Sequence, residues 1–465
     1  MTRFAPILQL PVDPATALVY EHGWQSWSPA GVHRLTTPSP RPATARWQTM
    51  AYRPEQPAPT DGFQGEGLLA VQPAAEAPVM VLHAPDPHAE VPSIRLELKG
   101  DIVVLSADGE VVTTEHGTDL MTALEEHGAA LADHLGVPSG GTERALGTGW
   151  CSWYGYYHDI TERAVRDELA LIDRHELAVD TVQLDDGYQT GIGDWLSRRT
   201  DAFPHPLPDL AARIAETGRS AGLWTAPFLV GADSELARDH PDWLVGGAEA
   251  ADEHWGQRIG VLDVTHPDAA EHLQTVFRTL TGWGFTYHTV DFLYGGALPG
   301  RRHIDVTALE AYGIGLQLLR EAIGPEAVLL GCGAPLLPSI GRVDAMRISP
   351  DIDPHFEPPL GDVSQPSGRG AVLMGRARAW QHGRWWVNDP DCITVRPQIE
   401  RRELWAAELA SHGGLAVSGD PMSALDDRGL AFTRELLLPP AEHAARWQPD
   451  PDDELGGSFT GTCLR

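Results

Sequence analysis

Short apolar runs alternate with amphipathic stretches from about residue 146 onward, and this alternation constrains the fold more than any other feature. It predicts repeated strand–helix units whose strands lie parallel in one sheet. Eight such units predict a closed (β/α)8 TIM barrel. An open doubly wound sheet is the alternative, but no G-x-G-x-x-G follows the first run. The expected strands are 146–152, 179–184, 221–228, 285–290, 326–331, 342–348, 384–388 and 414–418.

Residues 1–116 predict an antiparallel β-sandwich that precedes the barrel. Short apolar stretches in this segment are separated by prolines, which is typical of sheets with many turns. Asp108-Gly109 lies between two alternating stretches, 102–106 and 111–114. This arrangement predicts a β-hairpin, because Asp-Gly suits the tight turns that join antiparallel strands.

The chain is expected to divide into four parts. A helical pattern covers 118–135, and the last expected helix, 424–436, leaves only about 30 residues after it. Because this remainder is too short for another full domain, we expect a C-terminal β domain to be absent or truncated. The expected parts are an N-terminal β-sandwich (1–116), a helical linker (117–142), a catalytic barrel (143–437) and a short C-terminal tail (438–465).

The charge balance excludes several classes of partner. The chain has 65 acidic and 34 basic residues, a formal net charge of −31. Nucleic acids and anionic membrane surfaces would be repelled, so we expect neither as a partner. The start of the chain predicts no signal peptide, and the four scattered cysteines have no zinc-site spacing. We therefore expect a cytoplasmic protein without metal or cofactor, and homo-oligomer formation stays open.

Acidic residues follow five of the predicted barrel strands. In a barrel, these carboxyl ends face one common site. A single such Asp would be read as a helix N-cap, but five strand ends with the same feature indicate a shared pocket. Clustered carboxylates suit a metal site, a glycoside-hydrolysing site or a passive sugar-binding cleft. The residues are Asp185, Asp186, Asp291, Asp351, Asp389, Asp391 and Asp420.

Aromatic residues lie at or near the same strand ends. Sugar sites combine aromatic stacking with carboxylates that accept hydrogen bonds from hydroxyls, whereas a metal site would not need the aromatic rings. The mixture therefore favours a carbohydrate pocket, with an oligosaccharide or glycoside as the expected substrate. The aromatic residues are Trp153, Tyr154, Tyr188, Trp195, Trp224, Tyr294, Trp385 and Trp386.

Seven segments, taken in order, resemble the motifs of glycoside hydrolase family 36, the microbial α-galactosidases or melibiases. Each segment alone is a weak pattern, but seven in the family's order are specific. They are Gly23-Trp-Gln-Ser-Trp-Ser28, Gly149-Trp-Cys-Ser-Trp-Tyr154, Gln183-Leu-Asp-Asp-Gly-Tyr188, Val290-Asp-Phe-Leu-Tyr294, Gly331-Cys-Gly333, Arg347-Ile-Ser-Pro-Asp351 and Asn388-Asp-Pro-Asp-Cys392.

The resemblance implies a retaining exo-α-glycosidase that hydrolyses terminal α-galactosides through a covalent glycosyl-enzyme. It assigns the nucleophile to Asp291, at the end of the fourth barrel strand, and the general acid/base to Asp351. The two aspartates are 351 − 291 = 60 residues apart, a spacing similar to that of compact bacterial members. The resemblance further implies substrate contacts by Trp27, Trp153, Tyr154, Asp185, Asp186, Trp224, Cys332 and Arg347.

The sequence departs from the family pattern two residues before the expected nucleophile. Members of the family usually read K-x-D there, with the Lys holding sugar hydroxyls, but this chain has Thr289, preceded by His288. We count Thr289 among the substrate-binding residues. One hypothesis is that His288 or an Arg supplies the missing contact. The alternatives are a different sugar preference, a transglycosylase, or a non-catalytic sugar-binding protein on the same barrel.

Overall fold

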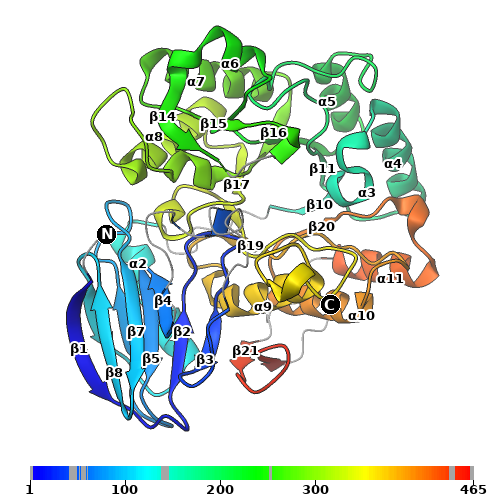
Figure 1. Ribbon diagram of the computed structural model, residues 1–465. Helices are drawn as coiled ribbons and strands as arrows, with labels where there is room; N and C mark the ends of the chain where they lie inside the picture. Colours follow the sequence, from blue (N-terminus) through cyan, green and yellow to red (C-terminus); the bar gives the residue numbers. More distant parts are fainter. Residues whose placement is uncertain are drawn as a thin grey trace.

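The computed structural model describes residues 4–40, 50–51, 53, 59, 61–137, 146–250, 254–438 and 446–460. Figure 1 shows two parts, an N-terminal pair of β-sheets and a larger ring of strands with helices around it. No helix among the described residues is both long enough and apolar enough to cross a membrane.

The larger part is a (β/α)8 barrel, as predicted. Its eight parallel strands follow the order β19-β18-β17-β16-β12-β11-β10-β20. The Leu415 amide donates to the Asn388 carbonyl at 2.8 Å and links the two end strands, so that the sheet nearly closes. Each predicted run overlaps one strand. The strands are β10 (Thr148–Cys151), β11 (Thr181–Leu184), β12 (Ser220–Thr225), β16 (Phe285–Val290), β17 (Val328–Gly331), β18 (Ala345–Arg347), β19 (Val387–Asp389) and β20 (Ala416–Ser418).

Helices cover the outside of this ring (Figure 1). The clearest local signal is at α8 (Ala308–Ile323), where Thr307 and Glu310 form a reciprocal capping box and Leu316 and Leu319 are buried. An apolar stripe of this kind packs a helix against the strands. The other barrel helices are α3 (Trp153–Tyr156), α4 (Glu162–Arg174), α5 (Leu207–Ala215), α7 (Pro267–Gly282), α9 (Gly368–Arg378), α10 (Arg402–His412) and α11 (Asp427–Leu436).

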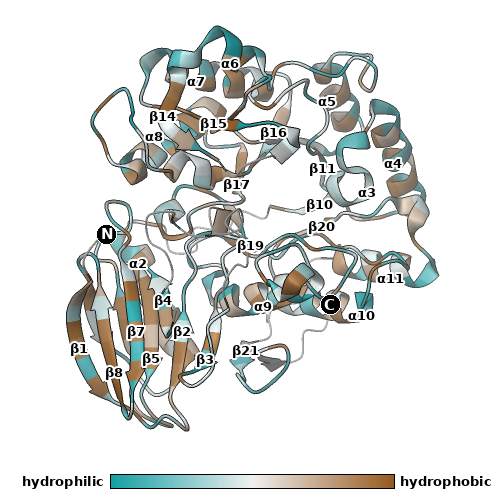
Figure 2. Cartoon of the chain, in the orientation of Figure 1, coloured by the Kyte–Doolittle hydropathy of each residue, from teal (hydrophilic) through white to brown (hydrophobic). Residues whose placement is uncertain are grey.

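The N-terminal part is the predicted antiparallel sandwich. Its sheets have the orders β1-β8-β7-β4 and β3-β2-β5-β6-β9, and side chains from both sheets share one core. Figure 2 shows alternating hydrophobic and hydrophilic bands along β1, β8 and β7, as expected for strands with one buried face. The strands are β1 (Ala5–Pro11), β2 (Leu18–Glu21), β3 (Gly31–Arg34), β4 (Phe63–Glu66), β5 (Leu68–Gln72), β6 (Met80–His83), β7 (Ser93–Lys99), β8 (Ile102–Ala107) and β9 (Val112–Glu115).

The hairpin predicted at Asp108-Gly109 is wrong. Strand β8 pairs with β1 and β7, whereas β9 pairs with β6 in the opposite sheet. Asp108 instead accepts a hydrogen bond from the Ser93 amide at 2.7 Å, so its carboxylate fixes the point where the chain leaves one sheet for the other. The tight turn is at Gly100, between β7 and β8, where φ is +68°.

A buried arginine joins the sandwich to the barrel. Arg378, at the end of α9, donates to the carbonyl oxygens of Gln25, Ser26 and Ser28 at 2.6–3.2 Å, and to that of Ile348 at 2.7 Å. These bonds tie the Trp-Gln-Ser-Trp segment to the chain just after β18. The N-terminal segment is therefore held at the carboxyl ends of the barrel strands.

Three further features lie outside the eight barrel units. Helix α2 (Leu120–His134) falls in the predicted linker, and the C-terminal segment contains the hairpin β21 (Arg446–Pro449) and β22 (Gly457–Thr460). A small antiparallel sheet follows β12. Its strands are β13 (Leu229–Gly231), β14 (Leu244–Glu249) and β15 (Ile259–Leu262). The predicted domain boundaries stay predictions.

Candidate active site

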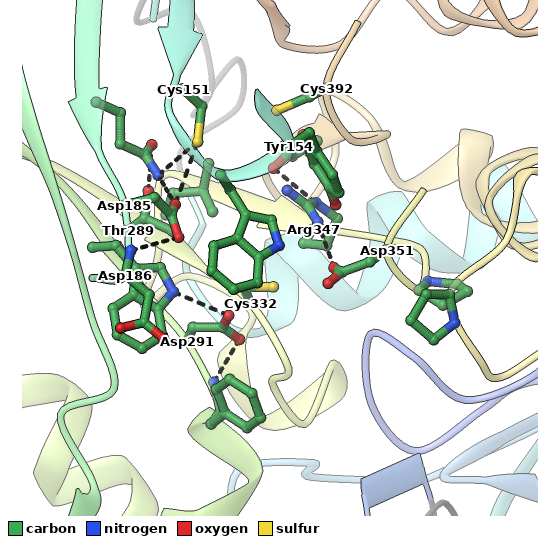
Figure 3. A pocket seen from close by; sticks show the side chains of 18 of the residues that line it. Cys151, Tyr154, Asp185, Asp186, Thr289, Asp291, Cys332, Arg347, Asp351 and Cys392 are labelled. Atoms are coloured by element: carbon green, nitrogen blue, oxygen red, sulfur yellow. Dashed lines mark hydrogen bonds and ion pairs between the residues drawn. The ribbon is translucent and has the colours of Figure 1, made fainter. Parts of the chain in front are cut away.

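A cavity of about 310 Å³ lies at the carboxyl ends of the barrel strands (Figure 3). Figure 3 shows Asp185, Asp186 and Thr289 on one side, Arg347 and Asp351 on the other, and Asp291 between them. Among the described residues, no group of three or more His, Cys, Asp or Glu side chains is arranged to hold a metal ion. The structure brings all the predicted site residues to this cavity: Trp27, Trp153, Tyr154, Asp185, Asp186, Trp224, Thr289, Asp291, Cys332, Arg347 and Asp351.

Asp291 directly follows β16 and is presented by a sharp bend in the chain. The next residue, Phe292, has a left-handed backbone with φ of +52°, and its amide donates to Asp291 Oδ1 at 2.5 Å. Trp224 Nε1 donates to Asp291 Oδ2 at 3.2 Å. Burial raises the pKa of Asp291, whereas these donors and the Cys332 thiol oppose the rise by stabilising the carboxylate.

Asp351 lies four residues after the end of β18 and faces the same cavity. Arg347 NH1 donates to Asp351 Oδ1 at 3.1 Å. Burial raises the pKa of Asp351 to about 6, with the charge of Asp291 adding to the rise and that of Arg347 opposing it. The two carboxyl groups of the site therefore have unlike environments, one surrounded by several neutral donors and the other by one shared cation.

Arg347 forms ion pairs with three carboxylates. Besides Asp351, its nitrogens lie 3.1 Å from Asp389 Oδ2 and 3.1 Å from Asp391 Oδ1. These carboxylates raise the pKa of the guanidinium, although burial acts against them, so the arginine stays charged. Tyr154 completes this side of the site by donating its hydroxyl to Asp391 Oδ2 at 2.5 Å.

The opposite side of the cavity holds Asp185 and Asp186, which are surrounded mostly by neutral donors. Asp185 Oδ2 accepts from Gln183 Nε2 at 2.7 Å and from the Cys151 thiol at 3.3 Å. Burial raises the pKa of Asp185 to about 7. Asp186 accepts from Trp255 Nε1 at 2.6 Å, from Gln189 Nε2 at 2.5 Å and has His158 Nε2 at 2.9 Å.

Thr289 acts on this pair of aspartates through Gln183. Its hydroxyl donates to Gln183 Oε1 at 2.8 Å, which orients the amide so that Nε2 points to Asp185. His288 does not supply the missing contact, because its ring packs on Phe277 and bonds Thr281, away from the cavity. The alternation of side chains along β16 explains the difference between the two residues. Arg347, the arginine among the lining residues, does not supply the contact either, because it forms ion pairs on the opposite side of the cavity.

The wall next to Asp291 is built from Trp27, Cys332 and Gly333. Trp27 contacts Phe292 edge to face, with ring centroids 5.1 Å apart. Gly333 has φ of +52°, and a Cβ there would lie 2.7 Å from the Trp27 ring and 3.1 Å from Asp291 Oδ1. Cys332 is buried and its thiol pKa is raised well above the ordinary value by desolvation, which suits a wall residue and not a nucleophile.

The melibiase family model matches residues 150–292 of the chain. An α-galactosidase from Thermus thermophilus, solved in complex with stachyose, is 29% identical with a TM-score of 0.76, and the alignment covers 94% of each chain. The chain is therefore similar to melibiases, through the family model over part of its barrel and through a solved α-galactosidase over nearly its whole length. The resemblance to glycoside hydrolase family 36 is thereby confirmed.

Two curated relatives match over a shorter region. The α-galactosidase AgaA of Geobacillus stearothermophilus is 29% identical over 188 residues, which cover 37% of this chain and 25% of that protein. An Escherichia coli α-galactosidase is 28% identical over 183 residues, 36% of this chain and 24% of the relative. The alignments thus span about a quarter of the length of these relatives.

Several residues that line the cavity are not among the site residues predicted from the sequence. Trp255 belongs to the connection between β14 and β15, and Met50 comes from the N-terminal part. Gln183, which stands in the Gln183–Tyr188 segment, and His158 also line the cavity, although neither has a role predicted from the sequence. The period-2 pattern of β11 places Gln183 and Asp185 on the same face, a signal that could have identified the glutamine.

Five of the eight aromatic residues named from the sequence do not line the cavity. They are buried in the core, because a strand end turns only some of its side chains inward. Asp420 is likewise a loop anchor, since its carboxylate accepts from the amides of Val395 at 2.5 Å and Arg396 at 3.1 Å. The buried aromatic residues are Tyr188, Trp195, Tyr294, Trp385 and Trp386.

Proposed function

We propose that this protein is a retaining exo-α-galactosidase that hydrolyses terminal α-galactosides. The observation that carries the proposal is the pair Asp291 and Asp351, which face one cavity from different strand ends in unlike environments. The Thermus thermophilus relative supports the substrate class, because it was solved with stachyose and with p-nitrophenyl α-D-galactopyranoside.

The reaction has two steps. Asp291, as a carboxylate, attacks the anomeric carbon while Asp351 gives its proton to the departing oxygen. This step forms a covalent galactosyl-enzyme and releases the aglycone. Asp351, now ionised, then takes a proton from a water molecule that attacks the anomeric carbon and frees Asp291. The configuration at the anomeric carbon is retained because it is inverted twice.

The environments of the two aspartates suit these roles. Three donors around Asp291 stabilise its charged form, which a nucleophile requires. Asp351 keeps its proton more readily because it is buried and close to the negative charge of Asp291. Once the charge of Asp291 is consumed in the covalent bond, that repulsion disappears, so Asp351 stays ionised after giving up its proton and can act as the base in the water step.

The sugar ring is proposed to lie between the two sides of the cavity. Asp185 and Asp186 accept hydrogen bonds from its hydroxyls, and the Trp153, Tyr154 and Trp224 side chains bound it. Trp27 and Arg347 complete the contacts, and Thr289 acts through Gln183. The N-terminal β-sandwich thereby serves the barrel by delivering Trp27. We further propose a cytoplasmic location, supported by the three buried free cysteines among the described residues.

Aryl glycosides test the proposal directly. The wild-type protein should release nitrophenol from α-galactoside, whereas Asp291→Asn should lose activity by a factor of about 10⁴ or more. Asp351→Asn should form the galactosyl-enzyme from an activated substrate and release it slowly, which intact-protein mass spectrometry detects as a mass increase of one hexose unit. If the wild type cleaves another α-glycoside but not the α-galactoside, the enzyme has a different sugar preference. That difference would be attributed to the side of the cavity that contains Thr289. No turnover of any glycoside by the wild type would refute the proposal.

A further inference from the structure

Asp391 is fully buried behind the cavity and does not line it. Its carboxylate nevertheless makes four contacts in the site. Oδ2 accepts from the Tyr154 hydroxyl at 2.5 Å and from the Ile352 amide at 2.7 Å, and Oδ1 accepts from the Cys392 amide at 2.6 Å and pairs with Arg347 at 3.1 Å.

Two of these contacts flank Asp351. Ile352 is the next residue along the chain, and Arg347 is the cation that donates to Asp351 itself at 3.1 Å. The carboxylate of Asp391 therefore fixes Asp351 both through the backbone and through the side chain of its ion-pair partner. Figure 3 shows Arg347 lying between Tyr154 and Asp351.

The backbone at Asp391 indicates that this geometry is imposed by the surrounding structure. Its φ is +98°, in a region that non-glycine residues rarely occupy. Such a conformation is unfavourable for a residue with a side chain and persists only where other interactions enforce it. Glycine would adopt it without cost, so the aspartate is present for its carboxylate and not for its backbone.

We propose that Asp391 is a positioning residue for the general acid, holding Asp351 in place through the Ile352 amide and through Arg347. This inference rests on the proposed function, because it presupposes that Asp351 donates the proton. Asp391 does not line the cavity, so it acts on the reaction only through the residues it contacts, chiefly Asp351's partners Arg347 and Ile352, and Tyr154.

The proposal predicts a change in the pH dependence. Without the charge of Asp391, Arg347 is shared by two carboxylates instead of three and interacts more strongly with Asp351. The repulsion between the carboxylates of Asp391 and Asp351 is also removed. Both changes favour the ionised form of Asp351. Burial raises the pKa of Asp391 itself to about 7, so its charge is only partly present near pH 6, and the basic limb of kcat/KM should move to lower pH by less than about one unit. The charged and titratable groups facing this network are Arg347 and Asp351 near β18, Tyr154 and Tyr157 at α3, Asp389 and Cys392 near β19, Asp291 after β16 and Cys332 after β17.

Two variants test it with two leaving groups. Asp391→Asn keeps the side-chain volume, and Asp391→Gly removes the carboxylate while suiting the positive φ. With phenyl α-galactoside, whose leaving group needs a proton, kcat/KM should fall by about 10²-fold. With 2,4-dinitrophenyl α-galactoside, whose leaving group departs without a proton, the fall should be below about fivefold.

Asp420→Asn is the matched control, because Asp420 is also a buried strand-end aspartate but anchors Val395 and Arg396 instead of the acid. It should lower the melting temperature and leave both the pH limb and the leaving-group ratio unchanged. Equal losses with both substrates and an unmoved pH limb in the Asp391 variants would overturn the inference while the wild type stays active. An inactive wild type would instead overturn the proposed function.

Discussion

Asp185→Asn should stabilise the folded protein at alkaline pH while it weakens sugar binding. Asp185 is buried, and its pKa is raised from an ordinary value near 3.8 to about 7. The folded state thus holds a proton between these two values that the unfolded state has lost. Wild-type stability accordingly falls as the pH rises through this window and is lowest above pH 7. Asparagine carries no charge and removes this dependence.

The magnitude follows from the width of the window. A rise of about three pKa units corresponds to about 4 kcal/mol at about 1.4 kcal/mol per unit, which is an upper limit for a buried group. Asparagine must still bury an amide against Gln183 and Cys151, which costs about 1–3 kcal/mol. A net gain of about 2 kcal/mol above pH 7 is therefore expected, equivalent to a melting-temperature increase of about 2 °C for a chain of 465 residues.

Thermal melts of both proteins at pH 4.5, 6 and 8, at equal ionic strength, measure this effect. At pH 4.5 the Asp185→Asn variant should melt below the wild type, because the cost of the buried amide remains while little of the charge penalty is present; at pH 8 it should melt above the wild type. Asp186→Asn is the control, because its amide would face the donors Trp255 and Gln189 and should destabilise at every pH. A difference for Asp185→Asn that does not change with pH would refute the reasoning.

Three further predictions concern catalysis. Thr289→Val removes the hydroxyl that orients Gln183 and should raise KM for α-galactosides about tenfold with little change in kcat, as steady-state kinetics would show; an unchanged KM would contradict it. For the wild type, kcat/KM should fall above about pH 6 as Asp351 loses its proton, and a flat profile to pH 8 would contradict that assignment. Gly333→Ala should lower kcat/KM at least about 10²-fold, because the new methyl group would lie 2.7 Å from the Trp27 ring. Gly136→Ala is the control: Gly136 also has a positive φ, but the space around it is open, so this variant should keep its activity.

The barrel was predictable because its pattern is local. Each βα unit is a short apolar run followed by a stripe of period 3.6, and the number of units alone indicates closure. The hairpin at Asp108-Gly109 failed for the opposite reason, since the choice of sheet for β9 depends on β6, more than 25 residues away. A turn signature cannot distinguish a chain that reverses within one sheet from one that crosses to the next.

The residues of the site likewise differ in whether a local sequence pattern predicts them. Asp291 and Asp351 could be placed from the sequence because they stand at strand ends, and a strand end is a local feature that the barrel converts into a shared position. Trp255 could not, because it reaches Asp186 through an inserted sheet whose course no periodicity describes. Asp391 is predicted in the shared pocket with the other strand-end aspartates, but it lies behind the cavity, and only the tertiary structure shows which amide and which cation its carboxylate holds.

Thr289 stands where the family usually has a lysine, so this side of the cavity lacks one positive charge near Asp185. The positive charge of Arg347 lies next to Asp351, whereas Asp185 is surrounded mainly by neutral hydrogen-bond donors. A lysine near Asp185 would favour its ionised form, whereas the Thr289–Gln183 pair orients a neutral amide there and leaves the carboxyl with a raised pKa. Sugar binding on this side should therefore depend on pH near neutrality, while bond cleavage depends on Asp351, so KM and kcat should titrate separately. A common pH dependence of both constants would show that the two sides of the cavity act as one unit.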